Sequence, residues 1–404
     1  MKLLVLSNGH GEDLVAIRII ERLQQDSARP LAALPIVGQG YAYKNLNIPL
    51  AGRVQQMPSG GFIYKGGNPL WQDLHGGLVQ LTLEQLKLVR QWGKTGGSIL
   101  AVGDIVPLLY AWWSKANYAF VGTAKSEYYL RDDRDWLART SWLEKKSNSV
   151  YLPWERWLMS HSRCKAVFPR DSLTTKILQQ QSIPAYDLGN PMMDGITGKT
   201  QPRTSGKLDI LLLPGSRMPE ALRNWQKILV AVRSVIKALP QEQLNFSTAI
   251  APELDLKPFV TKVVTQGWQI ASRESDTATL TYNNNTLILG QQRYQQFLKQ
   301  ADIAIAMAGT ATEQFVGLGK PAIIFPGEGP QFTFAFAEAQ SRLLGCSITM
   351  IDPDLVGEAI AKIIQNDRLL EQIAVNGKQR MGEAGAAQRI AECLQKTLLK
   401  VSSP

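Results

Sequence analysis

The sequence predicts an α/β protein with two Rossmann-like domains that face each other across a cleft. The chain of 404 residues is long enough to form two hydrophobic cores. An apolar run at residues 2–6 precedes a glycine-containing loop and an amphipathic helix at 14–23, as at the start of a doubly wound domain. A second apolar run at 208–213 also leads into a glycine loop, which starts the pattern again.

The composition is that of an ordinary globular protein with a basic excess. Hydrophobic residues make up 45% of the chain and charged residues 19%. The 44 Lys and Arg against 34 Asp and Glu leave a net charge of +10. This charge suits nucleic acid, an anionic membrane surface or phosphorylated substrates. Because the sequence contains no arginine-rich run and no zinc-finger spacing, we expect no nucleic-acid partner.

Few residues suit a metal site or a disulfide framework. Three cysteines lie far apart in the sequence, which is typical of a reducing compartment and of small buried side chains. With only three histidines and no Asp-x-Asp motif after a strand, we expect no metal and no cofactor. The start of the chain is too short and too polar for a signal sequence, and no run reaches membrane-spanning length. We therefore expect a cytoplasmic protein.

In the first half, apolar runs predict parallel strands near 31–37, 98–102, 119–121 and 165–168, with a helix at 172–180. The loop at 7–13 contains the pair Gly9-x-Gly11, but Leu14 occupies the third glycine position of a dinucleotide fingerprint. The second strand also lacks the acidic residue that would bind a ribose. A nicotinamide cofactor is therefore not expected.

Two apolar segments of the first half allow two interpretations. Residues 57–92 alternate glycines with aromatic and aliphatic side chains, with Lys65, Lys87 and Arg90 among them. This segment is either a long loop packed on its own domain or an apolar lip at a membrane surface. The aromatic and basic segment 151–159 is likewise either core or a second interfacial patch.

The polar segment 198–207 is the best linker candidate. It separates an N-terminal domain, 1–197, from a C-terminal domain, 208–385. The second domain is expected to contain a strand at 245–250, a hairpin around Asn283-Asn284-Asn285 and a helix at 294–300. Residues 386–404 are expected to form a terminal helix and tail, for which packing back on the N-terminal domain is one option.

The turn Gly309-Thr310-Ala311-Thr312 lies between a buried strand and a short helix and has little side-chain bulk. Amides at the start of a helix favour an anion. Glu313, in the first helical turn, can accept hydrogen bonds from ribose hydroxyls. Phosphate on amides and ribose on a carboxylate is an arrangement that binds a nucleotide.

Arg217 follows a buried strand in the loop Pro214-Gly215-Ser216-Arg217. The planar guanidinium suits the oxygens of a diphosphate. The alternative is an ion pair with Glu220. Because the turn at Gly309 is also present, we favour the ligand-binding role.

Four motifs together resemble the lipid-A-disaccharide synthase family. They are 213–217, 309–313 with Lys320-Pro321, Gln331-Phe332-Thr333-Phe334, and 189–194. The family consists of inverting glycosyltransferases of the GT-B fold. The resemblance implies a UDP-sugar donor in the C-terminal domain and a lipid-linked or amphiphilic acceptor at the N-terminal domain. It implies that Ser216 and Arg217 hold the diphosphate with Gly309, Thr310 and Ala311, that Glu313 holds the ribose, and that Gln331 and Phe332 lie beside the donor.

The N-terminal half departs from the family pattern. Asn8-Gly9-His10-Gly11-Glu12-Asp13 stands where the family has a Gly-Glu-Thr-Ser-Gly-Asp type of loop. Only Asp104 remains of two acidic residues in the next motif, because Leu108 occupies the second place. The sequence therefore indicates a relative of the synthase with a different acceptor or base.

Inversion needs a base near the acceptor hydroxyl. His10 follows the first strand, beside Gly9 and Gly11, which we expect to contact the substrate, and its ordinary pKa suits a base at neutral pH. Asp104 either orients His10 or acts alone, and His10 has the alternative role of bonding only its own loop. At least one of Glu12 and Asp13 is expected to be a charge at a helix N-terminus.

The expected function is sugar transfer from a UDP-sugar to a lipid or glycolipid at an anionic membrane surface. The enzyme is expected to be peripheral to the membrane, and the sequence leaves both a monomer and a homo-oligomer open. The alternatives are a UDP-sugar 2-epimerase of the same fold and an inactive protein that binds nucleotide sugars.

Overall fold

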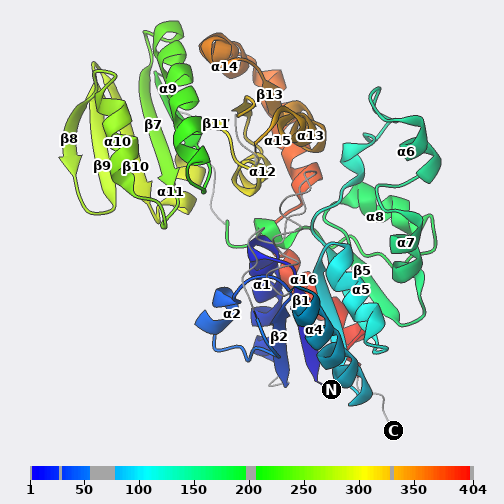
Figure 1. Ribbon diagram of the computed structural model, residues 1–404. Coiled ribbons are helices and arrows are strands. Elements are labelled where there is room, and N and C mark those ends of the chain that lie inside the picture. The colour runs from blue at the N-terminus through cyan, green and yellow to red at the C-terminus, as the bar shows by residue number, and fades with distance from the viewer. Residues whose placement is uncertain (1, 27–29, 55–77, 197–205, 328–331, 401–404) are drawn as a thin grey trace. The chain divides into compact units, whose positions relative to one another are not determined.

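A computed structural model describes residues 2–26, 30–54, 78–196, 206–327 and 332–400 of the chain. The chain divides into two compact units (Figure 1). Unit 1 comprises residues 1–194 and 382–404, and unit 2 comprises residues 195–381.

Unit 1 is built on a parallel sheet of five strands in the order β2-β1-β3-β4-β5. The strands are β1 (Leu3–Ser7), β2 (Leu31–Pro35), β3 (Ser98–Gly103), β4 (Tyr118–Gly122) and β5 (Cys164–Phe168). All five residues of β1 and of β4 are buried, as expected for strands covered on both faces. The parallel strands predicted from the apolar runs are confirmed.

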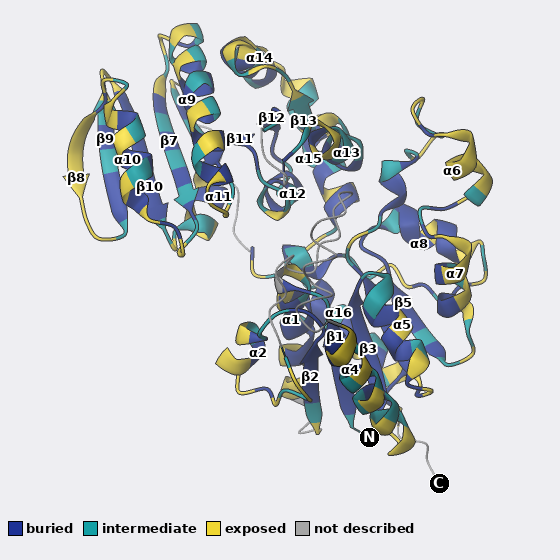
Figure 2. Cartoon of the chain, viewed as in Figure 1, coloured by how far each residue is buried: buried dark blue, intermediate teal, exposed yellow. Residues whose placement is uncertain are grey.

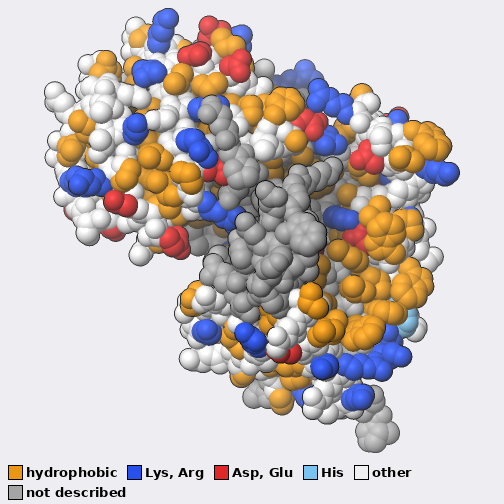
Figure 3. Space-filling model, viewed as in Figure 1, with side chains coloured by type: hydrophobic (Ala, Val, Ile, Leu, Met, Phe, Trp, Pro, Cys, Tyr) orange, Lys and Arg blue, Asp and Glu red, His pale blue; other side chains and the backbone are white. Residues whose placement is uncertain are grey.

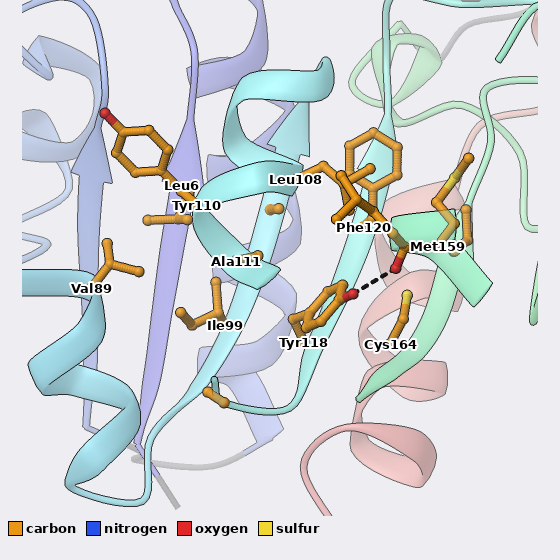
Figure 4. Close-up of a cluster of buried hydrophobic side chains, with 14 of the residues drawn as sticks. Leu6, Val89, Ile99, Leu108, Tyr110, Ala111, Tyr118, Phe120, Met159 and Cys164 are labelled. Carbon is orange, nitrogen blue, oxygen red and sulfur yellow. Dashed lines mark hydrogen bonds between the residues drawn. The ribbon is translucent and has the colours of Figure 1, made fainter. Parts of the chain in front are cut away.

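Helices cover both faces of this sheet, and each face has its own core (Figure 2). One core joins the sheet to α1 (His10–Asp26) and α16 (Ala386–Thr397). The other joins it to α4 (Leu78–Lys94), α5 (Ile105–Trp113) and α7 (Pro153–Ser160). In this second core, the Tyr118 hydroxyl donates to the Leu158 carbonyl at 2.5 Å (Figure 4). Shorter helices are α2 (Tyr41–Asn45), α6 (Trp142–Ser147) and α8 (Ser172–Gln179).

The first helix begins earlier than its apolar periodicity predicts. The periodicity starts at Leu14, but α1 starts at His10, and the Asp13 amide already donates to the Gly9 carbonyl at 2.8 Å. Glu12 and Asp13 lie in the first turn, where negative charge favours the helix terminus. The expected loop of residues 7–13 therefore shortens to two residues between strand and helix.

Asp194 binds the start of the last helix, α16, to the rest of unit 1. Its carboxylate accepts hydrogen bonds from the backbone N–H groups of Gly385, Ala386 and Ala387 at 2.6–3.0 Å. These amides open α16, so Asp194 satisfies donors that a helix start leaves without partners. This gives the motif at 189–194 a structural role.

Unit 2 contains an eight-stranded sheet in the order β13-β12-β11-β6-β7-β10-β9-β8. The strands are β6 (Lys207–Leu213), β7 (Gln243–Ile250), β8 (Gln269–Arg273), β9 (Thr277–Tyr282), β10 (Asn285–Gln291), β11 (Ile303–Ala306), β12 (Ala322–Ile324) and β13 (Ile348–Met350). The β9–β10 pair is antiparallel, which confirms the hairpin predicted at Asn283-Asn284-Asn285. β8 also pairs antiparallel with β9, whereas the strands from β13 to β10 pair in parallel.

The helices of unit 2 are α9 (Glu220–Ala238), α10 (Leu256–Val264), α11 (Tyr294–Gln300), α12 (Thr310–Gly317), α13 (Phe334–Leu344), α14 (Val356–Ile364) and α15 (Asp367–Met381). The helix predicted at 294–300 is confirmed. Among the helices of both units that the structure describes, none has the length and apolar character needed to cross a bilayer.

Candidate functional site

Two loops of unit 2 meet at the carboxyl ends of neighbouring strands, β6 and β11. The Met307 amide, just after β11, donates to the Leu213 carbonyl at the end of β6, at 2.8 Å. Gly215, in the loop after β6, has a φ of +96° and an ideal Cβ 3.4 Å from the Met307 carbonyl oxygen. The glycine therefore fits a left-handed position next to backbone. Loops at the carboxyl ends of parallel strands are where α/β proteins bind ligands.

The turn at Gly309 has the open geometry that the sequence predicts. Gly309 caps α12 without a side-chain hydrogen bond, and Thr310 is exposed. An ideal Cβ on Gly309 has only Phe336 within contact range, at 3.3 Å. Gln340 of α13 supports the turn, because its side-chain amide donates to the carbonyls of Ala308 and Gly309 at 3.2 Å each. The amide end of α12 is thus held in place by neighbours and suits an anion.

Four further predicted ligand residues share this end of unit 2. Ser216 and Arg217 are exposed in the loop after β6, and Glu313 is half-buried in the first turn of α12. Ala311 is half-buried in the same turn. The structure therefore brings the Arg217 loop and the Gly309–Glu313 turn to adjacent strand ends.

Glu220 and Phe332 hold the loop before α13. Glu220 is buried, and its carboxylate accepts a hydrogen bond from the Phe332 amide at 3.1 Å. The Phe332 ring is 3% exposed and packs on Phe336 with 5.3 Å between ring centroids. The ring therefore lies inside unit 2, and its expected place beside a donor stays a prediction. Gln331 lies outside the described residues.

In unit 1, polar side chains gather at the carboxyl ends of three adjacent strands. Asn8 follows β1, Asp104 follows β3 and Thr123 follows β4. The Asn8 amide donates to both Asp104 oxygens, and Asp104 also caps α5 by accepting from the Val106 amide at 2.9 Å. The Thr123 hydroxyl donates to the Glu12 carboxylate at 3.4 Å. Two carboxylates, Glu12 and Asp104, thus share one sheet edge.

Two glycines allow this close arrangement. Gly103 has a φ of +135°, and its ideal Cβ lies 3.3 Å from Glu12 Cγ and 3.2 Å from the Pro107 ring. Gly9 has a φ of +137° and an ideal Cβ 3.4 Å from Glu12 Oε2. A larger residue at either position meets both backbone strain and the Glu12 side chain or its neighbours. Gly9 therefore shapes this edge directly, whereas Gly11 lies exposed in the first turn of α1.

Burial raises the pKa of Glu12 above its ordinary value, and the negative charges of Asp104 and Asp13 act in the same direction. A carboxyl group in this environment keeps its proton to higher pH than an exposed one. Sequence reasoning treated Glu12 only as a helix-terminal charge. Its sequence position could have indicated a place at this site, because Glu12 lies in the first turn after the first strand and the loop that contains Asp104 follows the neighbouring strand.

Asp13 has a structural role. It is 2% exposed and accepts a hydrogen bond from the Ser7 hydroxyl at 2.5 Å, while Tyr43 donates to Ser7 at 2.6 Å. Burial raises the pKa of Tyr43 well above its ordinary value, so it remains a donor. His10 is the first residue of α1, and its side chain is outside the described part of the structure.

Across the described ranges, no three His, Cys, Asp or Glu side chains gather as a metal site. The groups at the carboxyl strand ends of unit 1 and of unit 2 are amides, hydroxyls, carboxylates and an arginine. Such groups suit the binding of a nucleotide and the transfer of a proton.

No family model matches the chain, and no curated protein matches it either. Solved structures match over nearly the whole length. They include the S. aureus MnaA–UDP complex, with 12% identity and a TM-score of 0.59, covering 100% of this chain and 98% of that one. The Neisseria meningitidis UDP-GlcNAc 2-epimerase bound to UDP-GlcNAc has 15% identity and a TM-score of 0.52, covering 98% and 100%. The spinosyn rhamnosyltransferase SpnG with its aglycone has 12% identity and a TM-score of 0.51, covering 97% and 99%.

The chain has the GT-B fold. Identities of 12–15% support a shared fold but not a shared function. The GT-B fold expected from the motifs is thereby confirmed, while the narrower relation to lipid-A-disaccharide synthase stays a prediction. The neighbours include both an epimerase and a transferase, so the fold alone does not decide the reaction.

Proposed function

We propose that this protein is an enzyme that acts on UDP-sugars, with the nucleotide held by unit 2. The observation that carries the proposal is the meeting of the Arg217 loop with the Gly309–Glu313 turn at adjacent strand ends. The amides of the turn and the Arg217 guanidinium would hold the diphosphate, and Glu313 would hold the ribose. Two structural neighbours with UDP or UDP-GlcNAc bound support a uridine nucleotide.

For the reaction, we propose 2-epimerisation of the UDP-sugar as the first candidate, because a full-length neighbour is a UDP-GlcNAc 2-epimerase. Inversion at C2 would require that a base remove the C2 proton while the C1–O bond to UDP breaks, so that the electron pair forms a C1=C2 double bond. A proton would then return to the other face of C2 as UDP adds back to C1. Glu12 and Asp104 supply two carboxyl groups in different environments, which is how one site provides an acid and a base. Asp104 would take the proton, and Glu12, which keeps its own to higher pH, would donate.

The second candidate is transfer of the sugar to a lipid or glycolipid acceptor, as the resemblance to lipid-A-disaccharide synthase implies. One observation of this chain favours it: unit 1 exposes the tryptophans Trp113, Trp154 and Trp157, which a soluble epimerase does not need. In transfer, Asp104 or His10 would remove the acceptor proton, and the sugar would leave UDP with inversion. Peripheral association with a cytoplasmic membrane face belongs to this candidate.

Product analysis by proton NMR separates these candidates. The protein is incubated with UDP-GlcNAc alone and then with a membrane lipid extract. A 2-epimer formed without lipid supports the first candidate and rules out transfer as the main reaction. UDP released only with lipid supports the second. Binding of UDP without any turnover would identify a nucleotide-sugar-binding protein and contradict both candidates. Asp104→Asn serves as the control, since it should abolish turnover but keep UDP binding.

A further inference from the structure

Helix α5 is apolar on its outer side as well as its inner side. Its sequence, Ile-Val-Pro-Leu-Leu-Tyr-Ala-Trp-Trp, contains no charged residue. Leu108 and Ala111 are buried in the core (Figure 4). Leu109 and Trp113, four residues apart and therefore on one side of the helix, are 45% and 49% exposed. The outer side of α5 is therefore apolar and about half exposed.

Helix α7 continues the same surface. Trp154 and Trp157 are 58% and 54% exposed, while Leu158 and Met159 of the same helix are buried. The rings of Trp112 and Trp157 lie 5.4 Å apart and connect α5 to α7. Leu109, Trp113, Trp154 and Trp157 form what we call the tryptophan face. Figure 3 shows hydrophobic side chains gathered over α5 and α7.

Cations border the tryptophan face at the end of α5. The Arg163 guanidinium donates to the carbonyls of Trp112 and Ala116 at 3.0–3.1 Å. Arg90 of α4 donates to the Trp113 carbonyl at 3.5 Å, and Lys115 is exposed between them. The one acidic residue of α5 and α7, Glu155, is buried and paired with Lys125. Lysines and arginines border the hydrophobic area in Figure 3 as well.

We propose that the tryptophan face rests on an anionic lipid bilayer. Tryptophan prefers the boundary between water and acyl chains, and neighbouring Lys and Arg side chains attract anionic headgroups. The net charge of +10 adds to this attraction. A second copy of the chain is disfavoured, because a two-fold contact would bring the cationic borders of two identical faces together. The expected lip at residues 57–92 lies largely outside the described residues. The proposed surface instead combines α5 with α7, which overlaps the segment 151–159 that was expected to be either core or a second interfacial patch.

This inference deepens the second candidate function, on which it rests, by naming the surface that meets the membrane and the chemistry of the lipid. Its test contains no nucleotide sugar, so either can fail without the other.

The test is co-sedimentation of the full chain with vesicles of phosphatidylcholine alone or with phosphatidylglycerol added. We expect binding to the phosphatidylglycerol vesicles that is about tenfold or more stronger than to phosphatidylcholine and that weakens with salt. The double variant Trp113→Gln/Trp154→Gln should lose at least about tenfold in binding. Lys115→Glu should weaken binding to phosphatidylglycerol only. Because all three side chains are exposed, far-UV circular dichroism and Tm should stay close to wild type.

Trp142→Gln is the matched control, since Trp142 is 70% exposed but lies on α6 under Lys146. It should bind vesicles like the wild type. Equal binding of the double variant and the wild type would overturn the proposal, as would no binding to either vesicle. A concentration-dependent dimer that the double variant abolishes would also overturn it, because the face would then be a contact between copies.

Discussion

The side-chain amide of Asn8 donates to both carboxylate oxygens of Asp104, at 3.2 Å each. The two residues are 96 positions apart in sequence and follow adjacent strands. The contact fixes the orientation of Asp104 while its first oxygen also caps α5. Because its orientation is fixed, Asp104 can present its carboxylate to a substrate in a single geometry.

Asp104→Asn should therefore lower kcat by about 10²–10⁴-fold, the range for loss of a proton-transfer group. The Kd for UDP should change less than twofold, because the nucleotide is assigned to unit 2. Asn8→Ala should lower kcat less, since it frees Asp104 without removing it. Steady-state kinetics and calorimetry measure the two quantities. An Asp104→Asn enzyme with wild-type kcat would refute the assignment.

Glu12 should make the stability of the protein depend on pH. Its pKa is raised in the folded state, chiefly by burial. The folded state thus holds a proton that the unfolded state releases, so this contribution is complete below the ordinary glutamate pKa and is lost as pH rises through the folded pKa. Glu12→Gln removes that loss. The difference in Tm, variant minus wild type, should become more positive as the pH rises from 4.5 to 7.5. A difference of 1 kcal/mol in the free energy of unfolding corresponds to about 2–4 °C in Tm.

The control for this experiment is Glu371→Gln, an exposed residue of α15. Its Tm difference should be flat over the same pH range. A flat difference for Glu12→Gln as well would show that Glu12 is not in the buried environment described above.

Glu313 should discriminate ribose from deoxyribose. Glu313→Ala should weaken UDP binding about 10–100-fold, which is the effect of losing a hydrogen bond of about 1.5–3 kcal/mol to a charged group. The same substitution should weaken binding of 2′-deoxy-UDP less, because this ligand lacks one of the two ribose hydroxyls that would bond to Glu313. Calorimetry with both ligands measures the difference. Glu358→Ala, also in the first turn of its helix, should bind both ligands normally. Equal losses for UDP and 2′-deoxy-UDP would contradict the role in ribose binding.

Lys320 should be a structural residue despite its place in a motif of the donor domain. It is 5% exposed, and its ammonium donates to the carbonyls of Leu298, Lys299 and Ala301 at the end of α11. Lys320→Met should cost about 2–5 kcal/mol, because three buried carbonyls lose their donor. Thermal unfolding should show this, with exposed Lys378→Met as the control. Loss of UDP binding without loss of stability would contradict a structural role.

The fold was largely predictable because its strands are buried on both faces. Residues 3–6 and 210–213 stand out as continuous apolar segments, and they lie in β1 and β6. The start of α1 was not predictable from periodicity. His10, Gly11, Glu12 and Asp13 have no apolar pattern, and the backbone hydrogen bond from Asp13 to Gly9 shows that the helix already includes them.

The candidate site was predictable where a motif concentrates it in one segment. The turn at 309–313 and the loop at 214–217 each lie within a few residues, and pairing of β6 with β11 brings them together. The edge of unit 1 was predictable only in part, since Asn8, Asp104 and Thr123 meet through strand order. The tryptophan face was predictable only in part. An interfacial patch was one of two expectations for the segment 151–159, but its union with Trp113 of α5 depends on tertiary packing.

The central claim is that unit 2 binds a uridine nucleotide, and thermal unfolding with UDP, GDP and dTDP tests it most directly. A ligand present at about 100 times its Kd raises the stability of the state it binds by roughly 2.7 kcal/mol. We predict a clear rise in Tm with UDP, smaller rises with the other two, and a loss of the UDP effect in Arg217→Ala. No response to UDP together with a clear response to GDP or dTDP would contradict the account.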